Sequence, residues 1–134
     1  MNQREIKLLQ DLCTPRRGER AFSIVDLIQK KTIPLDLAAF LASKVALGAS
    51  WIVCSGPGGV GKTTTMRSLL PFAPADRRLG LALPNKVLDL RFEQGCLISN
   101  ELSDHPPPTY LWDQDLRDFF ALSQDHVLVA NVHA

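Results

Sequence analysis

The segment at 55–65 combines glycines, a lysine and threonines in a spacing that suits phosphate binding, and it reads SGPGGVGKTTT. The fixed positions of the pattern G-x-x-x-x-G-K-[ST] are filled by Gly56, Gly61, Lys62 and Thr63. Glycine lets backbone N–H groups curve around phosphates with no side chain in the way. The lysine ammonium then pairs with the β- and γ-phosphates of a nucleotide, and the hydroxyl of Thr63 is the expected Mg²⁺ ligand. We therefore expect nucleotide binding by Gly56, Gly58, Gly59, Gly61, Lys62, Thr63 and Thr64.

The flanking segments predict the elements that such a loop requires. Residues 51–54 form a short apolar run rich in strand-forming residues, which predicts a buried strand leading into the loop. Residues 63–70 are expected to form a helix that ends at Pro71, and its positive end would point at the phosphates. Strand, loop and helix thus follow in the required order, which favours a nucleotide site over a glycine-rich turn.

A carboxylate follows a second apolar run, because residues 96–100 lead directly into Glu101. A phosphate-loop enzyme needs an acid near the Mg²⁺ and the attacking water, to hold the metal's water shell or to orient the nucleophile. We expect Glu101 to be this catalytic acid and part of the metal site. Asp104 lies three residues further on and is a second candidate for the same role. The alternative for Glu101 is an exposed glutamate at a strand end.

A third apolar run, at 127–132, predicts a buried strand that ends in His133. Ligands of parallel sheets bind outside the carboxyl ends of the strands. The phosphate loop, Glu101 and His133 all follow predicted strands, so we expect them to converge at one edge of the sheet. There His133 could contact the γ-phosphate of a bound nucleotide, and the alternative is an exposed side chain near the chain end.

Strands that alternate with helices predict an α/β fold with a largely parallel sheet. Helices are expected at 4–12, after an N-cap at Ser23, from Pro34 to Gly48, and at 113–124. Residues 71–78 are expected to form a turn-rich connection, 86–92 a half-exposed edge strand, and 105–108 a rigid proline loop. We divide the chain into a polar N-terminal segment, 1–20, and a single nucleotide-binding domain, 21–134.

Composition narrows the classes of function further. The 134 residues are 46% hydrophobic and carry a formal net charge of +1, which gives no reason to expect a nucleic-acid partner. The three cysteines, Cys13, Cys54 and Cys96, have no metal-site spacing, and the latter two lie in predicted buried strands. No signal peptide or membrane-spanning run is evident, so we expect a cytoplasmic protein.

Several further segments match, in chain order, the segments of one family of ATPases. They are the apolar opening at 22–27, Phe40-Leu41, the strand and loop at 51–64, and, loosely, 72–77. Residues 96–104 are similar to that family's Walker B segment, an apolar run followed by G-E-[IMV]-R-[DG], and 130–134 are similar to its histidine box, T-[ILV]-H-[AT]. In this order they resemble the ring ATPases of type II and type IV secretion. The most similar branch drives tight-adherence pili and type IV secretion.

The resemblance implies a RecA-like P-loop NTPase that binds ATP and Mg²⁺. It implies that Glu101 is the catalytic acid, sharing the metal site with Thr63, and that His133 senses the γ-phosphate. It further implies a homo-oligomer, or an association with secretion or pilus machinery, in the cytoplasm and peripheral to the inner membrane.

The chain also departs from the family pattern. Residues 81–85 read LALPN where the family carries an acidic box, Asn100 replaces a glycine, and Ser103 replaces an arginine. The family's arginine-bearing N-terminal domain and its later helices have no counterpart in this sequence. We therefore expect a truncated or degenerate member with an incomplete fold, an uncovered apolar face on the strand at 127–132, weak ATP hydrolysis and no stable active ring.

Other readings stay open. A partitioning ATPase has a similar loop, but Pro57 occupies the place of its first lysine. A small-molecule kinase would need an arginine-rich lid, and none is evident in the sequence. A nucleotide-binding interaction module with little turnover would be consistent with the missing acidic box.

Overall fold

The computed structural model of the chain describes residues 3, 7, 22–55, 62–92, 95–104 and 109–133. The glycine loop, with Gly56, Gly58, Gly59 and Gly61, lies outside these residues, as do the proline segment at 105–108 and, apart from Lys7, the helix expected at 4–12.

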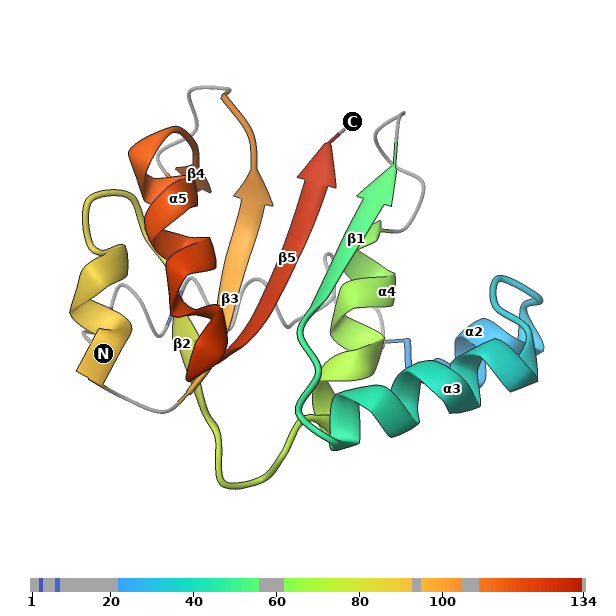
Figure 1. The fold of residues 1–134 in the computed structure, drawn as a ribbon. Helices are drawn as coiled ribbons and strands as arrows, with labels where there is room; N and C mark the ends of the chain where they lie inside the picture. Colours follow the sequence, from blue (N-terminus) through green and yellow to red (C-terminus); the bar gives the residue numbers. More distant parts are fainter. Residues whose placement is uncertain are drawn as a thin grey trace.

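The centre of the molecule is a parallel β-sheet. Its strands are β1 (Trp51–Ser55), β2 (Arg78–Leu81), β3 (Gly95–Leu102), β4 (Tyr110–Leu111) and β5 (Val127–His133). The order is β1-β5-β3-β2, β4 also pairs with β3, and all of these pairs are parallel. The carboxyl ends of β1, β5 and β3 lie at the same edge of the sheet, the upper edge in Figure 1. The predicted α/β fold with a largely parallel sheet is therefore confirmed.

Helices cover the sheet from opposite sides (Figure 1). On one face, α4 (Lys62–Leu69) contributes to a core cluster made of Met66, Cys96, Ile98, Val127 and Val129. On the other face, α5 (Gln114–Ala121) contributes Phe119 to a larger cluster that includes Leu97, Leu102, Leu111, Leu128 and Ala130. Alternate residues of β5 thus enter opposite clusters, and residues 127–130 are at most 2% exposed. The expectation of an uncovered apolar face on this strand was wrong, since helices of this same chain cover both faces.

Two further helices, α2 (Ile24–Gln29) and α3 (Leu35–Ala46), pack beside α4. The predicted N-cap is confirmed, because Ser23 and Asp26 form a reciprocal capping box at the start of α2. Pro34 is the N-cap of α3, and Gly48 follows the helix with a φ of 93°, a conformation that glycine adopts readily. In the described part of the chain, no helix has the length and hydrophobicity needed to cross a membrane.

The sequence prediction was wrong between the α4 and β3 segments. Residues expected to form an edge strand instead form a 3₁₀ helix, η3 (Val87–Phe92), whose inward residues Val87 and Leu90 are three positions apart. One neighbour of β3 is instead β2, whose first residue, Arg78, ends the predicted turn-rich connection and whose residues 79–81 were not predicted to form a strand. β2 has four residues, and one of them is Gly80, a residue type that is rare in strands. Its sequence therefore predicts a strand only weakly.

The first strand is also less buried than predicted. β1 lies at one edge of the sheet. Its Trp51 and Val53 pack against the core cluster that contains Met66 of α4, the α4-side cluster. Ile52 is 42% exposed, and Cys54 is exposed as well, contrary to the expectation of a buried thiol. Cys96, on the central strand β3, is buried as predicted.

Candidate functional site

An ion pair joins the start of α4 to the end of β3. The ammonium Nζ of Lys62 lies 2.8 Å from Oε1 of Glu101, although the residues are 39 positions apart in the chain. Their side chains are 12% and 15% exposed, so water screens the pair less than it would at the surface. The predicted phosphate-binding lysine and the predicted catalytic acid therefore meet at the carboxyl edge of the sheet.

The next residue of α4 is linked to the sheet by a buried amide. Nδ2 of Asn131 donates a hydrogen bond to Oγ1 of Thr63, at 3.2 Å, and a second one to the backbone carbonyl of Asn100, at 3.4 Å. Asn131 lies on β5 and is only 1% exposed. One side chain thus connects the predicted metal ligand Thr63 with the residue that precedes Glu101.

An irregularity in the strand pairing sets this geometry. Ser99 of β3 pairs with Ala130 of β5, but the next pair is Leu102 with Val132, so β3 has one more residue than β5 between the pairs. Such a bulge changes the direction of the local side chains and is frequent beside active sites. Here it places Asn100 and Glu101 opposite the single residue Asn131.

The other predicted site residues are placed only in part. Thr64 lies in the first turn of α4 and is half-buried. The backbone of His133 ends β5 and pairs with Ser55, the residue directly before the glycine loop. The side chain of His133 lies outside the described residues, as do the four glycines. Asp104 is exposed just beyond β3, and the structure gives it no contact with this site among the described residues.

Sequence reasoning missed Asn131 as a site residue. The signal was present, because an amide inside the apolar run 127–132 needs a polar partner when it is buried. What the sequence did not reveal was that α4 and β3 supply these partners. Within the described ranges, no group of three or more His, Cys, Asp or Glu side chains could hold a metal ion. A metal here would instead depend on the mixed oxygen atoms of Thr63, Glu101 and Asn131.

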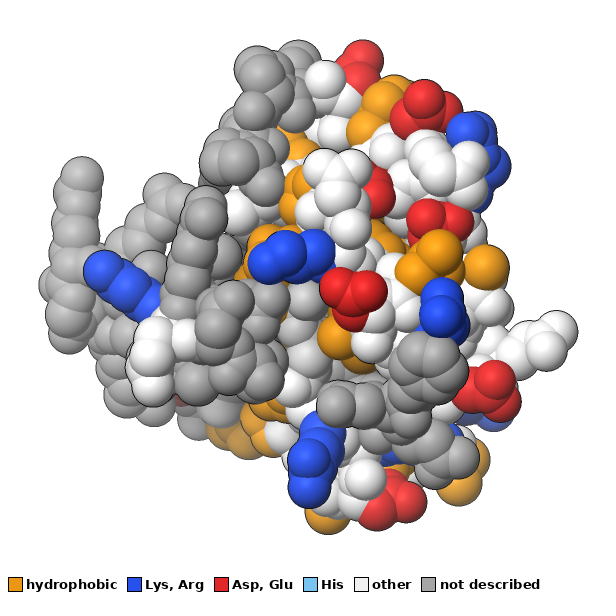
Figure 2. Space-filling model, turned by 90° about the vertical axis from the view of Figure 1, so that its left-hand side faces the viewer, with side chains coloured by type: hydrophobic (Ala, Val, Ile, Leu, Met, Phe, Trp, Pro, Cys, Tyr) orange, Lys and Arg blue, Asp and Glu red, His pale blue; other side chains and the backbone are white. Residues whose placement is uncertain are grey.

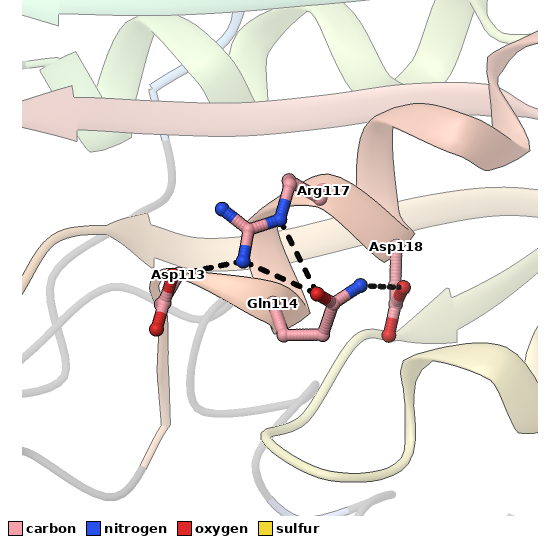
Figure 3. Close-up of polar contacts among 4 residues, drawn as sticks. All are labelled: Asp113, Gln114, Arg117 and Asp118. Carbon is pink, nitrogen blue, oxygen red and sulfur yellow. Dashed lines mark hydrogen bonds and ion pairs between the residues drawn. The ribbon is translucent and has the colours of Figure 1, made fainter.

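A second polar cluster lies at the start of α5 (Figure 3). Nη2 of Arg117 lies 3.0 Å from Oδ1 of Asp113 and also contacts Gln114, whose amide nitrogen donates to Asp118. The Arg117 and Asp113 side chains are 64% and 77% exposed, so this cluster is a solvated surface feature. Figure 2, which views the left-hand side of Figure 1, shows acidic and basic side chains interspersed on the surface.

Comparisons with known proteins identify no family for this chain. No protein-family model matches the chain, and no curated protein matches it either.

Proposed function

We propose that this chain is a RecA-like P-loop domain that binds Mg²⁺-ATP, the ATP-binding core of a secretion or pilus-assembly motor ATPase. The observation that carries the proposal is the ion pair between Lys62 and Glu101. It brings together a lysine in the phosphate-loop pattern and an acid at the end of a neighbouring strand. These are the cation that contacts phosphates and the carboxylate that orients water in phosphoryl transfer.

The order of the strands supports the same proposal. β5 lies between β1, which leads into the glycine loop, and β3, which carries Glu101. Nucleotides bind at the carboxyl edge of such parallel sheets. The carboxyl ends of β1 and β5 and the acid of β3 therefore lie at the same edge of the sheet. α4 begins beside them, so the positive end of its dipole favours an anion there.

The donor atoms at this edge fit a hard cation. A threonine hydroxyl, a carboxylate and an amide oxygen are the kinds of ligand that Mg²⁺ binds, directly or through its waters. Thr63 and Glu101 would hold the ion, which neutralises charge on the phosphates when bound. Phosphates entering the site would compete with Glu101 for the ammonium of Lys62. Glu101 would then be available to orient the attacking water.

One observation favours the alternative, a nucleotide-binding interaction module with little turnover. At the place where the secretion ATPases carry their acidic box, this chain has Leu81 and Ala82, which are 6% and 0% exposed. These residues pack in the protein interior and contribute no carboxylate. We therefore expect weak hydrolysis by this chain.

A steady-state phosphate-release assay separates the two functions, with light scattering after gel filtration to report the oligomeric state. Slow but Glu101-dependent release, without a stable active ring, is the result that the ATPase proposal predicts. Release that equals the buffer blank, together with intact ATP binding, would support the interaction module. A discrete ATP-stabilised hexamer with rapid turnover would contradict the expectation of weak hydrolysis.

A further inference from the structure

The amide oxygen of Asn131 is buried and unpartnered. The residue is 1% exposed, its Nδ2 makes two contacts, and Oδ1 has no hydrogen-bond partner among the described residues. Buried acceptors without donors destabilise a fold, so they are rare and call for an explanation. An absent donor, supplied by a ligand or a bound water, is one such explanation.

The orientation of this amide is determined by its neighbours. Reversing the side chain would place Oδ1 against the backbone carbonyl of Asn100, and both of these atoms can only accept hydrogen bonds. Nδ2 must therefore face Asn100 and Thr63, since Oγ1 of Thr63 can accept. The unpartnered atom is the oxygen, and the missing group is a donor.

Among the buried side-chain atoms without a partner, the oxygen of Asn131 is the one that lies at the proposed nucleotide site. Three buried side-chain atoms have no partner in the described part of the chain: Trp51 Nε1, Ser99 Oγ and Asn131 Oδ1. Trp51 begins β1, at the opposite edge of the sheet from its carboxyl end. Ser99 pairs with Ala130, whose side chain belongs to the core cluster that contains Phe119 of α5. Of these atoms, Asn131 Oδ1 alone belongs to the group of side chains around Lys62, Thr63 and Glu101.

We propose that Oδ1 of Asn131 accepts a hydrogen bond from a water in the coordination shell of the Mg²⁺ that Thr63 binds together with the nucleotide. This inference rests on the proposed function. Mg²⁺ gives up its waters reluctantly and usually keeps several of them, so donors are available at the required place. Nδ2 of the same side chain donates to Oγ1 of Thr63, which leaves an oxygen lone pair for the metal. Asn131 is thus a positioning residue that holds both a ligand and a water of the ion.

The experiment measures the affinity of a non-hydrolysable ATP analogue by calorimetry, once in EDTA and once in Mg²⁺. The ratio of the two dissociation constants is the Mg²⁺-dependent gain in affinity. For Asn131→Leu, which is close in shape, we expect the affinity in EDTA to be unchanged and the gain to fall about tenfold or more. Asn131→Ala gives the same test if the leucine variant fails to fold. Ser99→Ala is the matched control, because it removes another buried unpartnered oxygen but should leave the gain unchanged.

The outcomes separate this inference from the proposed function. If the wild type binds no nucleotide under either condition, the proposed function itself fails. If the wild type binds with a clear gain and a folded Asn131 variant retains all of it, Asn131 has only a structural role and this inference is overturned. Wild-type binding without any gain in Mg²⁺ would overturn it as well, while nucleotide binding stands. A loss of the gain in the Asn131 variants alone is the supporting result.

Discussion

Nζ of Lys62 lies 2.8 Å from Oε1 of Glu101, and this pair joins the helix after the glycine loop to the central strand β3. Both side chains are mostly buried, so each charge is compensated mainly by its partner and little by water. Removing either side chain would leave the other charge mostly buried and uncompensated, so we expect the two residues to be energetically coupled.

The first prediction concerns the strength of this pair. In a double-mutant cycle of Lys62→Met and Glu101→Gln, followed by urea unfolding, we expect a coupling free energy of about 1–3 kcal/mol. The matched control is the exposed pair of Arg117 and Asp113, tested with Arg117→Met and Asp113→Asn. Solvent screens that pair, so its coupling should be about 0.5 kcal/mol or less. Equal coupling in the two cycles would show that Lys62 and Glu101 are screened by water to the same degree.

The second prediction assigns the hydrolytic step. Glu101→Gln keeps the shape of the side chain but removes its charge, so phosphate release should fall by about 10²-fold or more while ATP binding is retained. Asp104→Asn is the control, because Asp104 is an exposed acid three residues away. We expect its rate to equal that of the wild type. A rate that falls in Asp104→Asn and not in Glu101→Gln would move the catalytic role to Asp104.

The third prediction tests the edge position of β1. In a Cys13→Ser background, a thiol reagent should label Cys54 rapidly in the native protein, because Cys54 is exposed. Cys96 is fully buried between α4 and the sheet, so it should react only after unfolding. Mass spectrometry of the labelled peptides distinguishes the two sites. Protection of Cys54 in the native protein would indicate that a further element covers β1.

The segments with a strong local pattern were predictable from sequence. The apolar runs at β1, β3 and β5, the N-cap residue Ser23 of α2 and the helical spacing of α5 all predicted the element that forms. Glu101 was predicted to lie at the site because a phosphate-loop enzyme needs an acid beside the loop, and this acid directly follows an apolar run. Lys62 was predicted from the phosphate-loop pattern alone. Nothing in the sequence indicated that its ammonium would pair with the carboxylate of Glu101.

The segments that depend on distant partners were not predictable. The residues of η3 have a pattern that also predicts a strand, because a short apolar pattern fits a period of two or three equally well. β2 and β4 are short and form by pairing with β3, which no local pattern records. The role of Asn131 depends on the bulge between Ser99 and Leu102, and the sequence alone does not specify that register.

Lys62 is expected to bind the phosphates of a nucleotide, and calorimetry with Mg²⁺-ATP measures this contribution. We compare the wild type with Lys62→Ala and with Lys86→Ala, which removes an exposed lysine elsewhere on the chain. A charged hydrogen bond to phosphate is lost only in the first variant, so its affinity should fall by at least about tenfold. Lys86→Ala should bind as the wild type does. Equal affinity in all three proteins, or no binding by the wild type, would show that Lys62 does not belong to a nucleotide site.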